Sequence, residues 1–344
     1  DTLIRKSKTA DMDELTYLYT SANNRLQGIN DRAGSSTVNN DIGDKTYSYD
    51  VCGRLTNDGS NPLTWNNAGF LKQYGSNSYG YSAMGKRTWK QTSSGIEFYV
   101  NDAAGNTLAS YQINGSELRL EDVNIFGASR LGAYHINKVV NDLTVDAVRD
   151  SFSRGLKRYE ITNHIGDVQA VLSDKRVHTT GGTTTDIVSA TDYYPFGMVM
   201  PGRSYGARDY RYGYQGMECD DEAVAGGDNE YTTEFRQYDP RVGRWMSVEP
   251  LARRFPAMSV YASNFNSPVN FVDKDGQCPI IWGALIGGGV GIGMELYSAY
   301  TDPTYEFGWD AMARVGIATG AGALTGGLSV LAPEAGMLTL MGAS

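Results

Sequence analysis

The chain has 344 residues, and its 30 Lys and Arg against 39 Asp and Glu give a formal net charge of −9. A chain this acidic is poorly suited to bind the phosphate backbone of a nucleic acid. We therefore expect no nucleic-acid partner. The 41% hydrophobic residues are enough to build a core. With three scattered cysteines (Cys52, Cys219 and Cys278) and three histidines, we expect no metal and no cofactor.

The first residues carry no targeting signal. Residues 1–13 are polar and charged, without the apolar run of a signal peptide. The chain also begins within a repeated pattern, which suggests a fragment of a longer protein. Localisation therefore has to be inferred from other features of the sequence.

Short repeats follow, each with an aromatic residue four positions before a glycine. They are residues 49–53 (Tyr-Asp-Val-Cys-Gly), 65–69 (Trp-Asn-Asn-Ala-Gly) and 81–85 (Tyr-Ser-Ala-Met-Gly), and residues 101–105 (Asn-Asp-Ala-Ala-Gly) form a fourth, imperfect copy. The first three glycines are about 16 residues apart, a spacing that indicates one structural unit per repeat.

Each repeat predicts a strand, a turn and a returning strand. Tyr47 and Tyr49 are two residues apart and so share one face of a strand. Asp50 can accept hydrogen bonds from the backbone ahead of it, and Gly53 can adopt the positive φ that closes a turn. Single hairpins are marginal, so we expect the units to stack into a continuous sheet. The alternative is an ordinary antiparallel sandwich whose turns use Gly and Asp.

The composition changes abruptly at Cys278. The last 67 residues contain 14 of the 41 glycines, and Arg314 is their one basic residue. Such a change predicts a domain boundary.

Longer motifs precede this boundary. They are residues 193–198 (Tyr-Tyr-Pro-Phe-Gly-Met), 210–222, 238–245 (Tyr-Asp-Pro-Arg-Val-Gly-Arg-Trp), 247–251, 264–268 and 273–276 (Asp-Lys-Asp-Gly). In order and spacing, these motifs and the repeats resemble the Rhs/YD-repeat family and its Rhs repeat-associated core domain, in the polymorphic-toxin form found in Bacteroidetes-type bacteria. The likeness covers about residues 15–276.

The resemblance implies a mainly β fold. In this family a YD-repeat β-strip spirals into a hollow shell that a C-terminal plug closes. We accordingly expect YD repeats over residues 1–190, the Rhs-associated core or plug over 191–277, and the start of a variable effector region over 278–344. The last region is expected to be a short Gly-rich helical tail.

The function implied by the resemblance is to encapsulate and help deliver a C-terminal toxin in interbacterial competition. The protein would be secreted or at the cell surface. Its partners would be its own C-terminal toxin segment, upstream shell repeats, and a secretion-system or immunity protein. The main alternative is a cell-surface carbohydrate-binding or adhesive protein, in which Tyr47, Tyr49 or Tyr81 stack on sugars. In the opposing interpretation these rings pack the inner surface of the sheet.

Some members of the family cut themselves after the core through an aspartyl-protease-like carboxyl pair. The matching residues here are Glu249, Asp273 and Asp275, and the cut would fall at the Gln277–Cys278 bond. Three positions depart from the family pattern: Glu249 replaces Asp, Ala252 replaces Gly, and Lys274 replaces Pro. An ammonium beside the pair would favour ionised carboxylates. In the alternative interpretation these carboxylates have no catalytic role and only cap turns. Under either interpretation we expect at most self-cleavage after the core, and no activity on a separate substrate.

The tail has a different glycine spacing. Gly283, Gly287 and Gly291 are four residues apart and would form one stripe on a helix. Residues 280–300 and 311–332 are long and apolar enough for a target membrane to be a partner. Two alternatives stay open, namely a hairpin against the inner wall of the shell and a linker to a toxin beyond Ser344.

Overall fold

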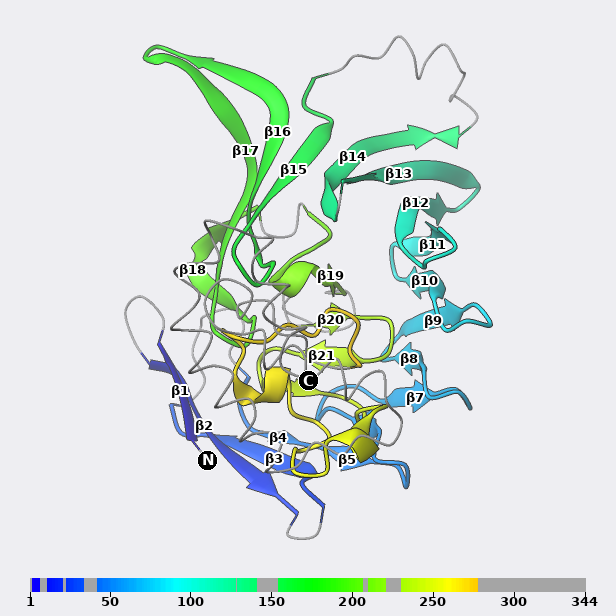
Figure 1. The fold of residues 1–344 in the computed structure, drawn as a ribbon, viewed down its shortest axis with the longest axis vertical. Coiled ribbons are helices and arrows are strands. Elements are labelled where there is room, and N and C mark those ends of the chain that lie inside the picture. The colour runs from blue at the N-terminus through cyan, green and yellow to red at the C-terminus, as the bar shows by residue number, and fades with distance from the viewer. Residues whose placement is uncertain are drawn as a thin grey trace, which may run out of the picture.

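In the computed structural model the chain is built from antiparallel strands (Figure 1). The structure describes residues 2–6, 11–20, 23–33, 42–127, 129–140, 154–206, 210–220 and 230–277. Across these ranges the helical elements are single 3-10 turns. The mainly β fold predicted from the sequence is confirmed.

The N-terminal strands form two small sheets. A four-stranded sheet has the order β1 (Thr2–Lys6), β2 (Asp11–Tyr19), β3 (Leu26–Asp31) and β4 (Lys45–Thr46). β5 (Ser48–Tyr49) and β6 (Leu55–Asn57) pair as a hairpin around the first repeat turn.

A twelve-stranded sheet follows, in which every strand pairs with its neighbours in the sequence. Its strands are β7 (Leu63–Trp65), β8 (Leu71–Tyr74), β9 (Asn77–Tyr81), β10 (Arg87–Thr92), β11 (Gly95–Asn101), β12 (Thr107–Asn114), β13 (Glu117–Phe126), β14 (Arg130–Val139), β15 (Lys157–Thr162), β16 (Val168–Thr179), β17 (Gly182–Tyr193) and β18 (Val199–Tyr205). We call this sheet the strip. It curves like a wall around the segment that follows it (Figure 1).

The repeat turns have one geometry, as the sequence predicts. At the first of them, Asp50 N–H donates to the Arg54 carbonyl (2.9 Å), and Gly53 N–H donates back to the Asp50 carbonyl (3.1 Å). The Asp50 carboxylate also accepts the N–H of Arg54 at 2.8 Å. The same pair of backbone bonds recurs at residues 66–70, 82–86, 102–106, 163–167, 194–198 and 213–217. The turn therefore extends beyond the repeats that the sequence shows most clearly.

The tyrosines of the repeats pack inside the curve. Tyr47 is only 8% exposed and belongs to a core cluster with leucines of the strip. The ring of Tyr49 packs against Tyr261 at 5.7 Å, and Tyr81 stacks on Phe70 at 5.0 Å. Tyr47 is buried, and Tyr49 and Tyr81 are partly buried against other rings, which favours packing over sugar binding for these tyrosines.

The segment enclosed by the strip consists of short elements. They are η3 (Tyr214–Gly216), β19 (Glu218–Cys219), β20 (Tyr231–Thr232), β21 (Gln237–Asp239), β22 (Arg244–Trp245), η5 (Ala252–Arg254) and η6 (Asn264–Asn266). We call residues 210–277 the core segment. Its centre is a stack of aromatic rings in which Tyr238 packs on Tyr214 at 6.1 Å and on Trp245 at 5.0 Å.

Buried charge pairs fasten the core segment to the strip. Arg87 of β10 lies 3.0 Å from Asp220, and both side chains are almost fully buried. Arg211 of the core segment lies 3.0 Å from Glu218 and also pairs with Glu97 of β11. An arrangement that separates the two partners of such a pair would leave a buried charge unpaired, which is strongly destabilising. These contacts therefore favour one position of the core segment against the strip.

The Gly-rich tail predicted over residues 278–344 lies outside the described residues, and so do the apolar stretches 280–300 and 311–332. Within the ranges described above, none of the helical turns has the length or hydropathy needed to cross a bilayer.

Candidate functional site

Two of the predicted carboxyl residues, Glu249 and Asp273, meet at Arg236, which no motif in the sequence indicated. Arg236 lies just before β21 and is 1% exposed. Its Nη2 is 2.6 Å from Oε2 of Glu249 and 3.0 Å from Oδ2 of Asp273. Its Nε donates to the carbonyl oxygen of Gly276, and its guanidinium lies over the Trp245 ring at 4.3 Å. One side chain thus joins both predicted carboxyl positions to the end of the core segment.

Asp273 is fully buried at the centre of this site. Its N–H donates to Oε1 of Gln215, and its Oδ1 accepts the N–H of Gly276, each at 3.0 Å. Burial, together with the neighbouring carboxyl of Asp275, raises the pKa of Asp273 to about 6 against the opposing effect of Arg236. Asp273 therefore titrates near neutral pH.

Glu249 approaches the same guanidinium from the other side. Its Oε1 accepts the N–H of Leu251 at 3.0 Å, which orients the carboxyl group. Burial raises the pKa of Glu249 to about 7, although Arg236 acts in the opposite direction. Although Glu is one methylene longer than Asp, the Glu249 carboxyl still contacts the Arg236 guanidinium that also contacts Asp273.

Asp275 forms the turn that leads out of the core segment. Its Oδ1 accepts the N–H of Gln277 at 3.0 Å, and its carbonyl accepts the N–H of Phe235 at 3.0 Å. Asp273 and Asp275 thus both accept backbone N–H groups of this turn, as expected if these carboxylates cap turns. The carboxyl groups of Asp273 and Asp275 therefore lie at the last described peptide, and Glu249 is joined to it through Arg236.

Lys274, which the sequence placed beside the carboxyl pair, also lies close to the strip. The charged groups that act on Lys274 are Arg130 and Glu160 of the strip. The cation that faces the carboxyl groups is Arg236, at a sequence distance of 37 residues from Asp273.

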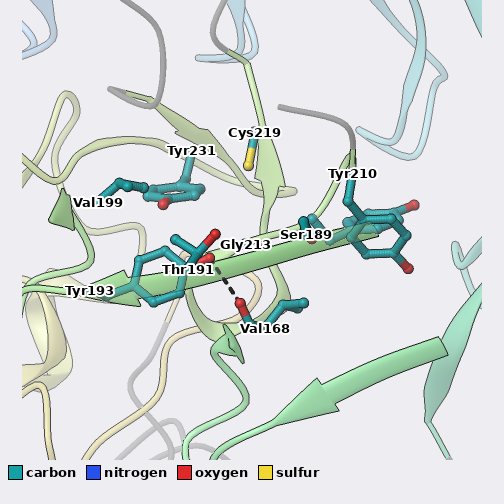
Figure 2. Close-up of a pocket in the computed structure, with 10 residues that line it drawn as sticks. Val168, Ser189, Thr191, Tyr193, Val199, Tyr210, Gly213, Cys219 and Tyr231 are labelled. Carbon is teal, nitrogen blue, oxygen red and sulfur yellow. Dashed lines mark hydrogen bonds between the residues drawn. The ribbon is translucent and has the colours of Figure 1, made fainter. Parts of the chain in front are cut away.

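Two further cavities lie near the core segment. Figure 2 shows one of about 10 Å³ between β17, β18 and the core segment, where the Cys219 side chain lies beside the Tyr231 ring and Tyr193 donates to the Val168 carbonyl at 3.1 Å. It has room for about one water molecule. A polar cavity of about 180 Å³ lies between the strip and the core segment, with Lys86, Arg87, Glu218 and Glu234 in its wall.

The carboxyl cluster has the properties needed for acid and base chemistry. Near neutral pH, two neighbouring acids with pKa values of about 6 and 7 supply a carboxylate and a carboxylic acid at the same time. A carboxylate can activate a water molecule, and the acid can protonate a leaving amine. In the part of the chain that the structure describes, no cluster of His, Cys, Asp and Glu is arranged to bind a metal ion.

No protein-family model matches the chain. Salivary gland surface protein 1 of Aedes aegypti is 27% identical over 232 residues, which are 62% of this chain and 6% of that protein. Toxin subunit YenC2 of Yersinia entomophaga is 32% identical over 28% of this chain and 10% of its own length, and toxin subunit YenC1 is 34% identical over 36% and 11%. The chain is similar to toxin subunits. It spans only 6% to 11% of the length of these curated relatives.

Solved structures of toxin complexes are also similar. The Photorhabdus luminescens Tc holotoxin pore matches with a TM-score of 0.48 and 19% identity, over 78% of this chain and 13% of that chain. A TcdB2-TccC3 structure matches with a TM-score of 0.42 and 17% identity, over 80% of this chain and 18% of that chain.

Proposed function

We propose that the chain forms the closing part of a β-shell that encloses a toxin segment beginning after Gln277. The observation that carries this proposal is the course of the chain. The strip curves around the core segment, buried pairs such as Arg87–Asp220 fasten the two, and the last described residues are held at the buried Arg236. The similarity to toxin subunits supports the same function.

We also propose how the chain is divided, where the protein is located and which partners it has. Residues 1–190 act as YD repeats, 191–277 as the core or plug, and 278–344 as the start of the effector region. The proposed division at residue 190 falls within β17, so both regions share one continuous sheet. Upstream repeats extend the shell, and the protein is secreted or held at the cell surface. A secretion-system or immunity protein is a further partner, and residues 280–300 and 311–332 are the segments proposed to meet a target membrane.

Two natural cysteines test the enclosure directly. Cys52 is exposed in the first repeat turn, and Cys278 is the first residue of the proposed enclosed segment. In the native full-length protein, we expect a membrane-impermeant maleimide to modify Cys52 at least ten times faster than Cys278. After denaturation both should react at similar rates. Equal rates in the native protein, measured by mass spectrometry of the labelled peptides, would exclude enclosure of this segment.

Self-cleavage at Gln277–Cys278 is a second proposed activity of the same chain. It is favoured by the carboxyl groups of Asp273 and Asp275 at the Gly276–Gln277 peptide and by Glu249, which shares the Arg236 guanidinium with Asp273. A water molecule activated by one carboxylate attacks the Gln277 carbonyl, and a neighbouring carboxylic acid gives its proton to the Cys278 amine. The C–N bond breaks, the water supplies the new hydroxyl of the acid product, and the shell retains the released segment.

Asp273→Asn is expected to reduce cleavage at Gln277–Cys278 at least 100-fold, because the amide can neither activate water nor donate an acidic proton.

The cleavage rate should also fall as the pH rises from about 6 to about 8, because the raised pKa values of Asp273 and Glu249 leave both groups ionised at the upper end. Intact-mass measurement of freshly refolded protein gives both results. Cleavage of the Asp273→Asn protein at the wild-type rate would rule out this mechanism.

A role at the cell surface is the alternative favoured by one comparison, the match to Salivary gland surface protein 1 over 62% of this chain. A ligand for such a protein would have to bind elsewhere than at Tyr47, Tyr49 and Tyr81, whose rings are packed inside the curve of the strip. We therefore place the enclosing function first.

A further inference from the structure

A buried carboxyl group that the carboxyl cluster at Arg236 does not use lies between the core segment and the strip. Glu230, directly before β20, is 0% exposed. Its carbonyl accepts the N–H of Asp220 at 3.1 Å, but among the described residues neither oxygen of its side chain has a hydrogen-bond partner. Burying a polar group in this state is costly, and burying a charge costs far more. Glu230 therefore fits this fold as a neutral acid and not as a carboxylate.

The two arginines that act on Glu230 are already paired. They are Arg87 of β10 and Arg241 of the core segment. Arg87 lies 3.0 Å from Asp220. Arg241 contacts Asp239 twice, at 3.0 Å from Nε to Oδ1 and at 2.7 Å from Nη2 to Oδ2. Each guanidinium is thus matched by one aspartate, and an ionised Glu230 would add a third negative charge to these two pairs.

The strip adds phenol groups and one ammonium group to these surroundings. The phenol groups that interact with Glu230 belong to Tyr74 on β8 and to Tyr79 and Tyr81 on β9. Burial raises the pKa of all three, so they stay neutral in the range in which a carboxyl group titrates. The ammonium of Lys90 on β10 lies 3.6 Å from Asp220 and 3.4 Å from Glu97. Like the two arginines, it is already engaged with other carboxylates.

Ionisation of Glu230 in the folded chain is therefore unfavourable. Burial, together with the carboxylates of Asp220 and Asp239, raises the pKa of Glu230 well above its ordinary value against the opposing effects of Arg87 and Arg241. In the unfolded chain the same group ionises near the ordinary value of 4.5. The stability that comes from neutral Glu230 is accordingly complete below this pH and is lost as the pH rises toward the raised pKa.

We propose that Glu230 makes the contact between strip and core segment sensitive to pH, so that the contact is firm while Glu230 is protonated and loosens when it ionises. The new charge arises beside the Arg87–Asp220 pair, which joins β10 to the core segment. One guanidinium cannot fully compensate two carboxylates, so the pair is weakened where it fastens the two parts. A rise in pH is thus the signal that loosens the core segment. This device lies within the described residues and does not depend on cleavage.

Urea unfolding at several pH values tests the device. Glu230→Gln keeps the shape of the neutral acid and cannot ionise. Between about pH 5 and about pH 9, we expect the urea midpoint of the natural chain to fall by at least about 0.5 M more than that of Glu230→Gln. The raised pKa values of Asp273 and Glu249 act equally in both chains and cancel in the comparison. Glu230→Met, which cannot titrate either, should give the same result without the amide group.

Glu160→Gln is the matched control. Glu160 of β15 is also buried where the strip meets the core segment, but it lies 2.6 Å from Arg130 and accepts the O–H of Tyr210 at 2.7 Å. Because its charge is compensated, the amide leaves Arg130 without a carboxylate. We therefore expect Glu160→Gln to lower the urea midpoint at about pH 9, whereas Glu230→Gln raises it relative to the natural chain.

Alkylation of Cys219 by iodoacetamide measures whether the contact loosens. Cys219 lies on β19 next to Asp220 and beside the Tyr231 ring (Figure 2), and the exposed Cys52 serves as the internal reference. From about pH 6 to about pH 8.5, the rate at Cys219 relative to that at Cys52 should rise at least about 10-fold in the natural chain and less than about 2-fold in Glu230→Gln. Mass spectrometry of the labelled peptides gives both rates.

Two results would overturn the proposal. If the urea midpoints of the natural chain and Glu230→Gln fall in parallel, Glu230 does not ionise at the expense of the fold. If the midpoints diverge but the two chains have the same labelling ratio at every pH, ionisation destabilises the fold as a whole and does not loosen this contact.

Discussion

Arg236→Met is expected to lower the free energy of unfolding by about 3–5 kcal/mol, because it leaves the buried carboxyl groups of Glu249 and Asp273 without their cation. It also removes the donor to the Gly276 carbonyl and the contact with the Trp245 ring. Methionine matches the length and much of the volume of the arginine stem, so the loss reports mainly on charge and hydrogen bonding. Urea-induced unfolding, followed by tyrosine and tryptophan fluorescence, gives the value.

The matched control for this variant is Arg203→Met. Arg203 also pairs with a carboxylate, Asp192 at 2.8 Å, but its side chain is 63% exposed. Exposed ion pairs contribute about 1 kcal/mol or less, so the control should be nearly neutral. If Arg236→Met were as mild as Arg203→Met, the carboxyl cluster would not be organised by this guanidinium.

Gly197→Ala is expected to destabilise the protein by about 3 kcal/mol or more, whereas Gly69→Ala should cost about 1–2 kcal/mol. Both glycines have a φ of +90° in the same type of turn, so both substitutions carry the same backbone strain. They differ in surroundings, since a Cβ at Gly197 would lie 2.4 Å from the Tyr214 ring, and a Cβ at Gly69 would meet no atom within 4 Å. Urea midpoints of the two variants measure the difference. Equal losses would mean that the turn at residues 194–198 does not pack on the core segment.

The repeat turns could be predicted from the sequence because their chemistry is local. Asp50, Gly53 and Arg54 lie within five residues of one another, and the hydrogen bonds of the turn join only these positions. The same holds for the strip, in which each strand pairs with the next strand in the sequence. Local turn chemistry and sequential pairing are enough to specify a curved antiparallel sheet.

The organisation of the candidate site could be predicted only in part. The motif likeness indicated Glu249, Asp273 and Asp275, but it gave no sign of Arg236, which contacts them across 13 and 37 residues of sequence. The side to which Lys274 points depends on how the last turn packs, and no local pattern fixes that. An arginine directly before a strand motif rich in aromatic residues is the sequence signal that could have drawn attention to Arg236.

A double-mutant cycle on Arg87 and Asp220 tests most directly whether buried charge pairs hold the strip around the core segment. These residues are 133 positions apart and meet at 3.0 Å only if β10 of the strip faces the core segment. With Arg87→Met, Asp220→Asn and the double variant, urea unfolding should give a coupling energy of about 1–3 kcal/mol. The exposed pair of Arg119 and Glu117 within β13 serves as the control and should give less than about 0.5 kcal/mol. A coupling between Arg87 and Asp220 that is indistinguishable from zero would contradict the enclosed arrangement.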